Sequence, residues 1–241
     1  MCRHLAYLGA PRTLEQLVVA PPHSLYEQSW APARQKHGTV NVDGFGVGWY
    51  VDRAAPVRYR RAQPIWTDAS FASLAPTIKT RCAVAAVRSA TAGMSADESA
   101  AAPFTDGRWL FSHNGRLQDW PTARKALLLD AADVPDTRVG VDSALLFGLA
   151  VARWQAGATL ADGLADTART VLDHGGGRLT MLAADGESVA AVVVGEPVHV
   201  LDEPDAVTVA SEPHDDSPRW REVPDLTVVQ VSAGGVTETS L

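Results

Sequence analysis

Cysteine and positive charge are both scarce in this chain. Its two cysteines, Cys2 and Cys82, are too few for a disulfide framework or a cysteine-based zinc site, and its seven histidines show no metal-ligand spacing. We therefore expect no metal and no cofactor, and we interpret Cys82 as a core residue. Asp and Glu number 28 against 21 Lys and Arg, a formal net charge of −7. No nucleic-acid partner is expected, because a phosphate backbone attracts basic surfaces.

Long hydrophobic runs are also missing. No apolar segment approaches the roughly 18–20 residues that a membrane-spanning helix needs, so we expect no membrane partner and a cytoplasmic location. Hydrophobic residues make up 46% of the chain and charged residues 20%, as in an ordinary globular protein. The one dense basic run, Arg58 with Arg60 and Arg61, is interpreted as a solvated strand edge rather than a binding site. The oligomeric state stays open.

The order of the expected elements predicts an α+β fold with antiparallel sheets. Strands come first, helices in the middle and strands again, without strand–helix alternation and without a low-complexity linker. We therefore expect one domain over residues 1–241, with an ordered loop over 21–38. Strands are expected over 2–8, 45–51, 57–61, 82–87, 109–112, 178–184, 189–194, 197–201, 206–210 and 226–231, and helices over 13–19, 68–78, 117–129, 143–155 and 160–172.

The most informative residue is Cys2, which follows Met1 directly. If Met1 is removed, Cys2 carries a thiol and a free α-amine on one carbon atom. The thiolate is the attacking form of a cysteine, and an ordinary α-amine can accept a proton near neutral pH. Nucleophile and base would then belong to one residue. The alternative is a small apolar residue on a buried first strand, and the position alone does not decide between the two.

Asn114 and Gly115 follow the strand expected over 109–112. A side-chain amide beside a glycine N–H supplies two neighbouring donors, which the stabilisation of a tetrahedral oxyanion requires. The same Asn-Gly pair is also a common turn, so both interpretations stay open for this pair alone.

Two charged residues could hold the ends of an amino-acid substrate. Arg88 ends the apolar run over 82–87, where an arginine needs an anion, either a protein carboxylate or a ligand carboxylate. Asp142 is predicted to be the N-cap of a helix, and an unpaired carboxylate there could also receive a substrate ammonium. Thiol, oxyanion donors, arginine and aspartate together describe the hydrolysis of a glutamyl amide.

Three glycines stand at positions 44, 46 and 48, at the start of an expected strand. Gly44 is predicted to have a positive φ, and Gly46 and Gly48 to let another backbone approach closely. No helix follows them, so a dinucleotide site is not expected.

The order of these motifs resembles that of the class II glutamine amidotransferases. The resembling segments are Cys2, Asn-Val-Asp-Gly-Phe-Gly at 41–46, Arg-Ser-Ala-Thr-Ala-Gly at 88–93, His-Asn-Gly at 113–115 and Asp142, with a similar segment at 210–213. The resemblance implies an N-terminal-nucleophile hydrolase with an αββα sandwich, two antiparallel sheets between helical layers. It also implies the roles of the site residues: Cys2 as nucleophile, Asn114 and Gly115 as oxyanion donors, and Arg88, Ser89, Thr91 and Asp142 as contacts of the glutamyl group.

Within that family, several stretches resemble the γ-glutamyl hydrolases of actinobacterial ergothioneine biosynthesis. These stretches are 1–12, 34–38, 68–73, 102–104 and 212–216. Ala102 stands where many synthase-linked glutaminases have a histidine, which weakens a plain glutaminase interpretation.

The resemblance implies a small-molecule substrate, γ-glutamyl-hercynylcysteine sulfoxide. Its trimethylammonium group is a cation of the kind that aromatic faces bind. The candidates to hold it are Tyr26, Trp30, Trp49, Trp66, Glu212, Asp215 and Asp216. Two alternatives remain: a glutaminase that supplies ammonia to a partner, and a non-catalytic protein that binds γ-glutamyl compounds.

Overall fold

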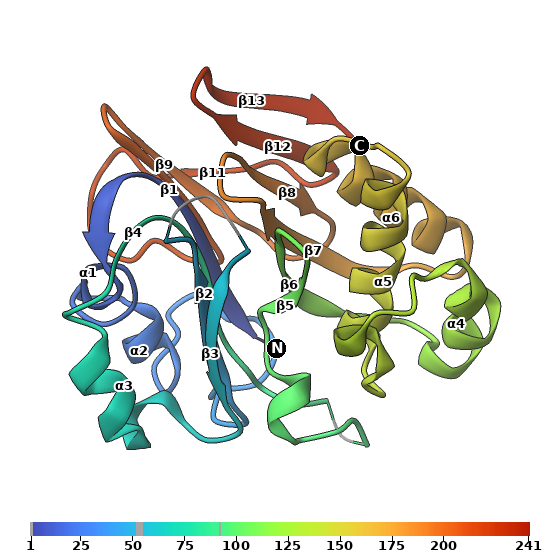
Figure 1. Cartoon of the computed structure of the whole chain (residues 1–241), viewed down its shortest axis with the longest axis horizontal. Helices are drawn as coiled ribbons and strands as arrows, with labels where there is room; N and C mark the ends of the chain where they lie inside the picture. The colour runs from blue at the N-terminus through green and yellow to red at the C-terminus, as the bar shows by residue number, and fades with distance from the viewer. Residues whose placement is uncertain (1, 52–54, 92) are drawn as a thin grey trace.

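The structure is a computed structural model that describes residues 2–51, 55–91 and 93–241. Two antiparallel sheets face each other, with helices on the outer side of each sheet (Figure 1). The first sheet contains β1 (Arg3–Thr13), β2 (Phe45–Trp49), β3 (Val57–Arg61), β4 (Lys79–Val87), β9 (His199–Glu203), β10 (Ala206–Ala210) and β11 (Arg221–Glu222). Its strand order is β11-β9-β10-β1-β4-β2-β3.

The second sheet has the order β13-β12-β8-β7-β6-β5. Its strands are β5 (Phe104–Asp106), β6 (Trp109–Leu117), β7 (Gly177–Ala184), β8 (Val189–Val193), β12 (Thr227–Ser232) and β13 (Gly235–Ser240). The α-helices are α1 (Leu14–Val18), α2 (Leu25–Gln28), α3 (Ala69–Leu74), α4 (Trp120–Leu127), α5 (Asp142–Gln155) and α6 (Leu160–Asp173). Short 3₁₀ turns are η1 (Ile65–Thr67), η2 (Glu98–Ala100), η3 (Leu128–Asp130) and η4 (Pro135–Arg138).

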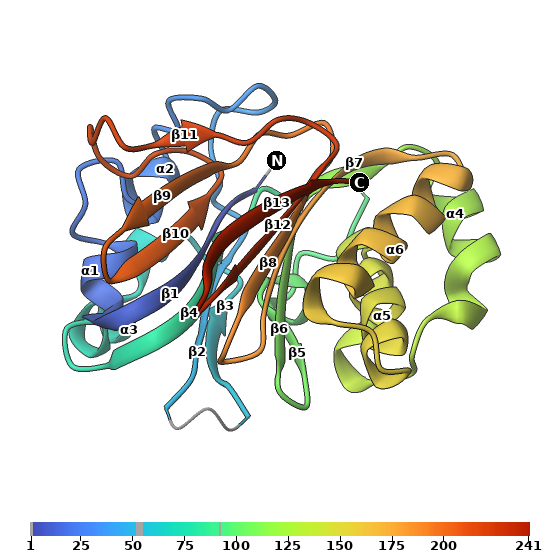
Figure 2. The same cartoon turned by 90° about the horizontal axis from the view of Figure 1, so that it is seen from above.

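Helices α1–α3 lie beside the first sheet and α4–α6 beside the second, on opposite sides of the molecule (Figures 1 and 2). Three apolar clusters fill the spaces, one between the sheets and one beneath each helical layer. The predicted αββα sandwich of two antiparallel sheets is confirmed.

Side-chain alternation along β1 decides which way the start of the chain faces. Leu5 and Tyr7 pack toward the helices of the first sheet, whereas Ala6 packs between the sheets. Because successive side chains of a strand point to opposite faces, His4 and Cys2 share the face of Ala6. The sequence pattern therefore directs Cys2 toward the second sheet.

The neighbouring antiparallel strands β1 and β4 define the two ends of the sandwich. At one end Arg3 pairs with Val87, and Cys2 and Arg88 extend beyond this pair; we call it the Cys2 end. At the other end Leu8 pairs with Cys82, and we call it the Cys82 end. The two cysteines of the chain are thus separated along one strand pair.

Most expected elements lie where the sequence predicted them, and the local chemistry explains why. Thr13 caps α1, and its hydroxyl and the Gln16 side chain form a reciprocal capping box. Gly44 has a φ of +134°, as predicted. A Cβ at Gly46 would lie 2.3 Å from the carbonyl oxygen of Ala102, so the predicted close backbone approach is confirmed there. At Gly48 the close neighbour is instead the side chain of Leu110.

Three sequence interpretations need correction. The basic run lies on an edge strand, β3, as predicted, but it is not fully solvated, because Arg58 and Arg60 both pair with Asp136, whose side chain is buried. The stretch expected as a loop over 21–38 contains α2, capped by Ser24. The helix expected over 68–78 ends at Leu74, although its Asp68 cap is present.

Within the described part of the chain, no helix is long and apolar enough to cross a membrane.

Candidate active site

Cys2 lies where the first sheet meets the second. Its backbone nitrogen donates to Oδ1 of Asn114 at 3.2 Å, which joins the start of β1 to β6. Its Sγ lies 4.0 Å from the carbonyl oxygen of Ser89, just beyond β4. The side chain is half-buried. The structure therefore brings Cys2, Asn114 and the segment after Arg88 together, although they are far apart in the sequence.

Asn114 is fully buried, and only one of its two amide atoms has a hydrogen-bond partner. Oδ1 accepts from Cys2, while Nδ2 is buried without a hydrogen-bond partner. A buried donor without a partner costs about 1–3 kcal/mol. Such a donor beside a thiol has the chemistry that an oxyanion needs.

Gly115 lies next to Asn114 on β6, opposite Leu179 of β7. Leu179 directs its N–H to Val194 on the other side of β7, so Gly115 and Leu179 form a pair that exchanges no ladder hydrogen bonds. We infer that the Gly115 N–H turns away from β7. Gly115 has a φ of +155°, and a Cβ there would lie 2.0 Å from the Arg178 carbonyl oxygen, so this position requires glycine.

His113 fixes the strand that carries Asn114 and Gly115. Its Nε2 lies 3.0 Å from the Arg178 carbonyl oxygen, and its Nδ1 lies 3.0 Å from the hydroxyl of Ser143 on α5. Because a carbonyl can only accept, Nε2 is the protonated nitrogen and Nδ1 accepts from Ser143. His113 thus ties β6 to β7 and α5 next to Asn114 and Gly115, the predicted oxyanion donors.

Arg88 is buried, and its guanidinium also has an unused donor. Nη2 donates to the Ser95 carbonyl oxygen at 2.5 Å, whereas Nη1 is buried without a partner. No carboxylate among the described residues pairs with Arg88, so the protein anion that the sequence left as one alternative is not found there. A ligand carboxylate is the remaining alternative.

Asp43 holds the backbone on which Arg88 stands, a role the sequence analysis did not assign. Its N–H donates to the Arg88 carbonyl oxygen at 2.9 Å, and its carboxylate accepts from the N–H of Ala90 at 2.7 Å. Ser89 and Thr91 lie on the same segment and are half-buried. Among the described residues, their hydroxyls have no hydrogen-bond partner, so both groups are available to a ligand.

Asp142 is not the helix cap that the sequence predicted. The N-cap of α5 is Val141, and Asp142 is the first helical residue. Its buried carboxylate accepts from the N–H of Ser143 at 2.8 Å and from the N–H of Leu117 at 3.1 Å. Each carboxylate oxygen keeps acceptor capacity beyond these bonds, so an ammonium contact stays chemically open.

Arg3 and Glu212 form a buried ion pair directly behind Cys2. Arg3 donates through Nε to the Cys2 carbonyl oxygen at 2.8 Å and through Nη1 to Glu212 at 3.3 Å. Burial lowers the pKa of Arg3, and the charge of Glu212 opposes that shift. Glu212 also accepts from the N–H of Arg34 at 2.8 Å. Because its carboxylate already accepts hydrogen bonds from Arg3 and Arg34, Glu212 is a poor candidate to bind a ligand cation.

The other candidates for a ligand cation differ in exposure. Trp49 is buried in the core beneath α1–α3. Asp215 accepts from the indole of Trp220 at 2.8 Å, and Asp216 is almost fully exposed near His23.

Three aromatic rings form an accessible cluster with nearly perpendicular planes. The ring centroids of Tyr26 and Trp30 lie 5.0 Å apart and those of Trp30 and Trp66 5.3 Å apart, and both tryptophans are 38% exposed.

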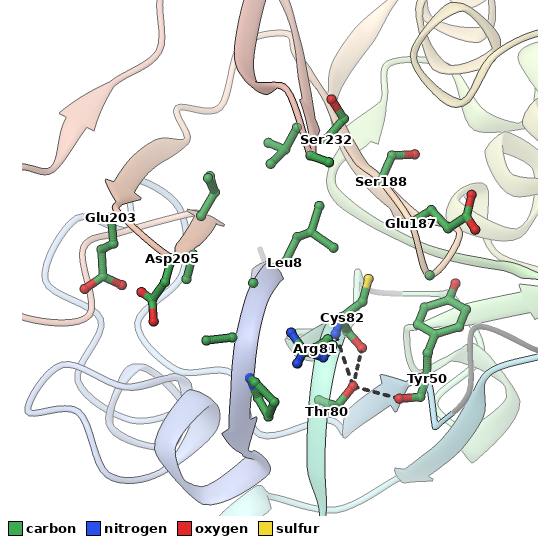
Figure 3. Close-up of a pocket in the computed structure, with 18 of the residues that line it drawn as sticks. Leu8, Tyr50, Thr80, Arg81, Cys82, Glu187, Ser188, Glu203, Asp205 and Ser232 are labelled. Carbon is green, nitrogen blue, oxygen red and sulfur yellow. Dashed lines mark hydrogen bonds between the residues drawn. The ribbon is translucent and has the colours of Figure 1, made fainter.

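A cavity of about 1050 Å³ lies at the Cys82 end rather than beside Cys2. Leu8, Tyr50, Cys82 and Asp205 are among its lining residues (Figure 3). Its size alone does not mark the reactive site, because the buried thiol of Cys82 has a pKa raised to about 12 by burial. Among the described residues, no group of three or more His, Cys, Asp or Glu side chains is placed to hold a metal ion.

Comparison with known proteins supplies the family. The model of the class II glutamine amidotransferases matches residues 23–204. The chain belongs to the class II glutamine amidotransferases. A protein of Mycolicibacterium smegmatis named γ-glutamyl-hercynylcysteine sulfoxide hydrolase is 45% identical over 248 positions that cover both chains completely. Two Mycobacterium tuberculosis proteins of the same name are 43% and 42% identical over all of this chain and 97% of theirs.

Solved structures of this family share the fold. A glutamine aminotransferase class-II domain protein from Silicibacter pomeroyi superposes with a TM-score of 0.73 at 24% identity, with 99% of both chains covered. Glutamine phosphoribosylpyrophosphate amidotransferase from B. subtilis gives a TM-score of 0.73 at 16% identity, over 99% of this chain and 49% of that one. These likenesses support the sandwich architecture and nothing finer.

Proposed function

We propose that this protein hydrolyses the γ-glutamyl amide bond of γ-glutamyl-hercynylcysteine sulfoxide and releases glutamate and hercynylcysteine sulfoxide. The observation that carries the chemistry is a pair of buried donors without partners, Nδ2 of Asn114 and Nη1 of Arg88. Asn114 accepts from the Cys2 nitrogen, and Ser89, the residue after Arg88, contacts the Cys2 thiol. The observation that favours this substrate is the similarity, over the whole chain, to relatives named for it.

In the proposed reaction, Cys2 acts as nucleophile and base. After removal of Met1, the α-amine takes the thiol proton and the thiolate attacks the γ-carbonyl carbon. The carbonyl oxygen becomes an oxyanion that accepts from Asn114 Nδ2 and the Gly115 N–H. The C–N bond then breaks, the α-ammonium returns its proton to the leaving nitrogen, and a γ-glutamyl thioester remains. Water, deprotonated by the α-amine, attacks the thioester and releases glutamate and the free thiol.

The glutamyl group is held by charges of opposite sign. Arg88 offers its unpaired Nη1 to the α-carboxylate, and Asp142 offers its remaining acceptor capacity to the α-ammonium. Ser89 and Thr91 add hydroxyl contacts from the segment that Asp43 fixes.

The leaving part carries a trimethylammonium group, for which the cluster of Tyr26, Trp30 and Trp66 is the best placed of the candidate aromatics. The position of Trp30 relative to the site follows from the backbone. Asn41 donates to the Ser29 carbonyl oxygen at 2.7 Å, and Asp43, two residues further on, donates to Arg88. Two residues of extended chain span about 7 Å. Trp30 therefore lies within reach of a long substrate anchored at Arg88.

A plain glutaminase is the second candidate, favoured by the family itself. A panel of γ-glutamyl compounds separates the two. We expect free glutamate to appear from the hercynylcysteine sulfoxide conjugate much faster than from glutamine. Faster release from glutamine would favour the glutaminase, and no glutamate from any compound would favour a binding protein.

We further propose that residues 1–241 form one catalytic domain in the cytoplasm that acts on a small molecule and needs no nucleic acid.

A further inference from the structure

Arg116 and Arg178 lie directly opposite each other on β6 and β7. Along these strands Leu110, Leu182 and Ala184 pack between the sheets, whereas odd-numbered residues pack toward α5 and α6. Leu117 also packs on the helical side, so the alternation continues past Gly115. Arg116 and Arg178 therefore share the face of Asn114, which is directed at Cys2.

Two like charges directly opposite each other destabilise an antiparallel pair. Arg178 is compensated, because its Nε lies 2.8 Å from the buried carboxylate of Glu196. Arg116 is exposed, and no described residue forms a hydrogen bond or an ion pair with its guanidinium. The sheet thus places the unpaired guanidinium of Arg116 opposite Arg178, two positions beyond Asn114 on β6.

The charges at the Cys2 end leave one cation unassigned. Arg3 pairs with Glu212 and Arg178 pairs with Glu196. The Asp43 carboxylate accepts from the Ala90 N–H, and Asp142 keeps acceptor capacity for an ammonium. A bound glutamyl group brings one carboxylate and one ammonium, which match Arg88 and Asp142. Arg116 then has no counterpart unless the leaving group supplies a second anion.

The leaving group of the proposed substrate has such an anion. Its cysteine part carries a carboxylate on the carbon next to the scissile nitrogen. In the proposed complex, Asn114 donates to the carbonyl oxygen of the scissile amide. Arg116 lies two residues further along the same face of the strand, a distance of about 6.6 Å. A guanidinium fork at that distance suits a carboxylate two bonds from the broken C–N bond.

We propose that Arg116 binds the α-carboxylate of an amino-acid leaving group, so that the site selects γ-glutamyl derivatives of α-amino acids over glutamine and simple γ-glutamyl amines. This inference rests on the proposed γ-glutamyl hydrolysis and adds a specificity determinant to it.

The test uses two substrates that differ only by this carboxylate, γ-glutamyl-alanine and γ-glutamyl-ethylamide. We expect the wild type to prefer the former in kcat/KM. Arg116→Gln should lower kcat/KM for γ-glutamyl-alanine about 10- to 100-fold, the range of a charge-assisted hydrogen bond, and leave the ethylamide unchanged. Arg116→Lys should fall between. The matched control is Arg81→Gln, an exposed arginine at the Cys82 end, which should change neither.

Two further readouts keep the test decisive. Both compounds are also measured as competitive inhibitors of hydrolysis of the hercynylcysteine sulfoxide conjugate, where only γ-glutamyl-alanine should bind more weakly to Arg116→Gln. The thermal midpoint of Arg116→Gln should not decrease, because the substitution removes a like-charge contact. Equal loss on both compounds, or loss on neither, would overturn the role of Arg116. A wild type that cleaves no γ-glutamyl compound would instead reject the proposed function.

Discussion

The two ends of the β1–β4 strand pair each carry a cysteine, yet they differ in chemistry. At the Cys82 end lies a cavity of about 1050 Å³, and the buried Thr80 hydroxyl there donates to the carbonyl oxygens of Tyr50 and Cys82 at 2.9 and 2.8 Å (Figure 3). At the Cys2 end, the amide of Asn114 and the guanidinium of Arg88 keep buried donors without partners.

We therefore assign the proposed reactive end from the unpaired donors of Asn114 and Arg88 rather than from cavity volume. A fold gains nothing from burying a donor without a partner, and about 1–3 kcal/mol is lost for each. Two such donors at the Cys2 end are explained if a substrate pairs with them. Burial of Cys82, by contrast, raises its thiol pKa to about 12 and keeps the thiol protonated.

The largest expected effect is on the two cysteines themselves. Cys2→Ala should lower the rate of glutamate release by at least about 10³-fold, because no other nucleophile replaces the thiol. Cys82→Ala should keep kcat and reduce only stability, since it removes a buried sulfur atom. Steady-state kinetics of both variants on one γ-glutamyl substrate makes the comparison. Comparable losses for the two would remove the distinction between the ends.

A second comparison concerns buried polar side chains at each end. Asn114→Ala should lower kcat about 10²–10³-fold, the usual cost of one oxyanion donor, with a smaller change in KM. The matched control is Thr80→Ala, which removes a buried and satisfied hydroxyl at the Cys82 end and should lower the unfolding midpoint but not kcat. An Asn114→Ala enzyme with normal kcat would exclude the amide from the oxyanion site.

The smallest expected effect is on the pH dependence of stability. His4, two residues from Cys2, is fully buried with Nδ1 3.0 Å from the Ser112 hydroxyl. Burial lowers its pKa well below the usual value, and the positive charge of Arg3 adds to this. The unfolded chain therefore binds one more proton than the folded chain below about pH 6.5, so stability falls as pH falls.

Replacing His4 should make this dependence shallower. We expect His4→Gln to reduce the slope of the unfolding free energy between pH 6.5 and 5 by up to about 1.4 kcal/mol per pH unit. Urea unfolding at several pH values measures it. His199 and His214, whose pKa values burial also lowers, should keep part of the slope in the variant. An unchanged slope would mean that His4 does not titrate in this way.

The main residues of the candidate site could be proposed from the sequence, because residue type alone indicates the chemistry available to Cys2, Asn114 and Arg88. The sequence could not give the exact boundaries of the strands and helices. The strand predicted to stop at residue 112 continues to Leu117, and only that continuation fixes the face of Arg116. Similarly, Asp142 misses the cap position by one residue.

The fold was predicted at the level of class and strand order along the chain, but the long-range contacts were not. The basic run of β3 looked solvated because its partner, Asp136, lies far along the chain in a short 3₁₀ turn. Asp43 was missed for the same reason, since its contact with Ala90 depends on the pairing of distant strands. Such contacts depend on tertiary structure and leave no local signal in the sequence.

Mass spectrometry of the active enzyme after treatment with iodoacetamide tests the central claim most directly. The account predicts a chain that begins at Cys2, alkylated there and not at Cys82, with activity lost in proportion to the alkylated fraction. Protection by a γ-glutamyl substrate should slow both together. Fully active enzyme that retains Met1, or full activity after complete alkylation of Cys2, would contradict it.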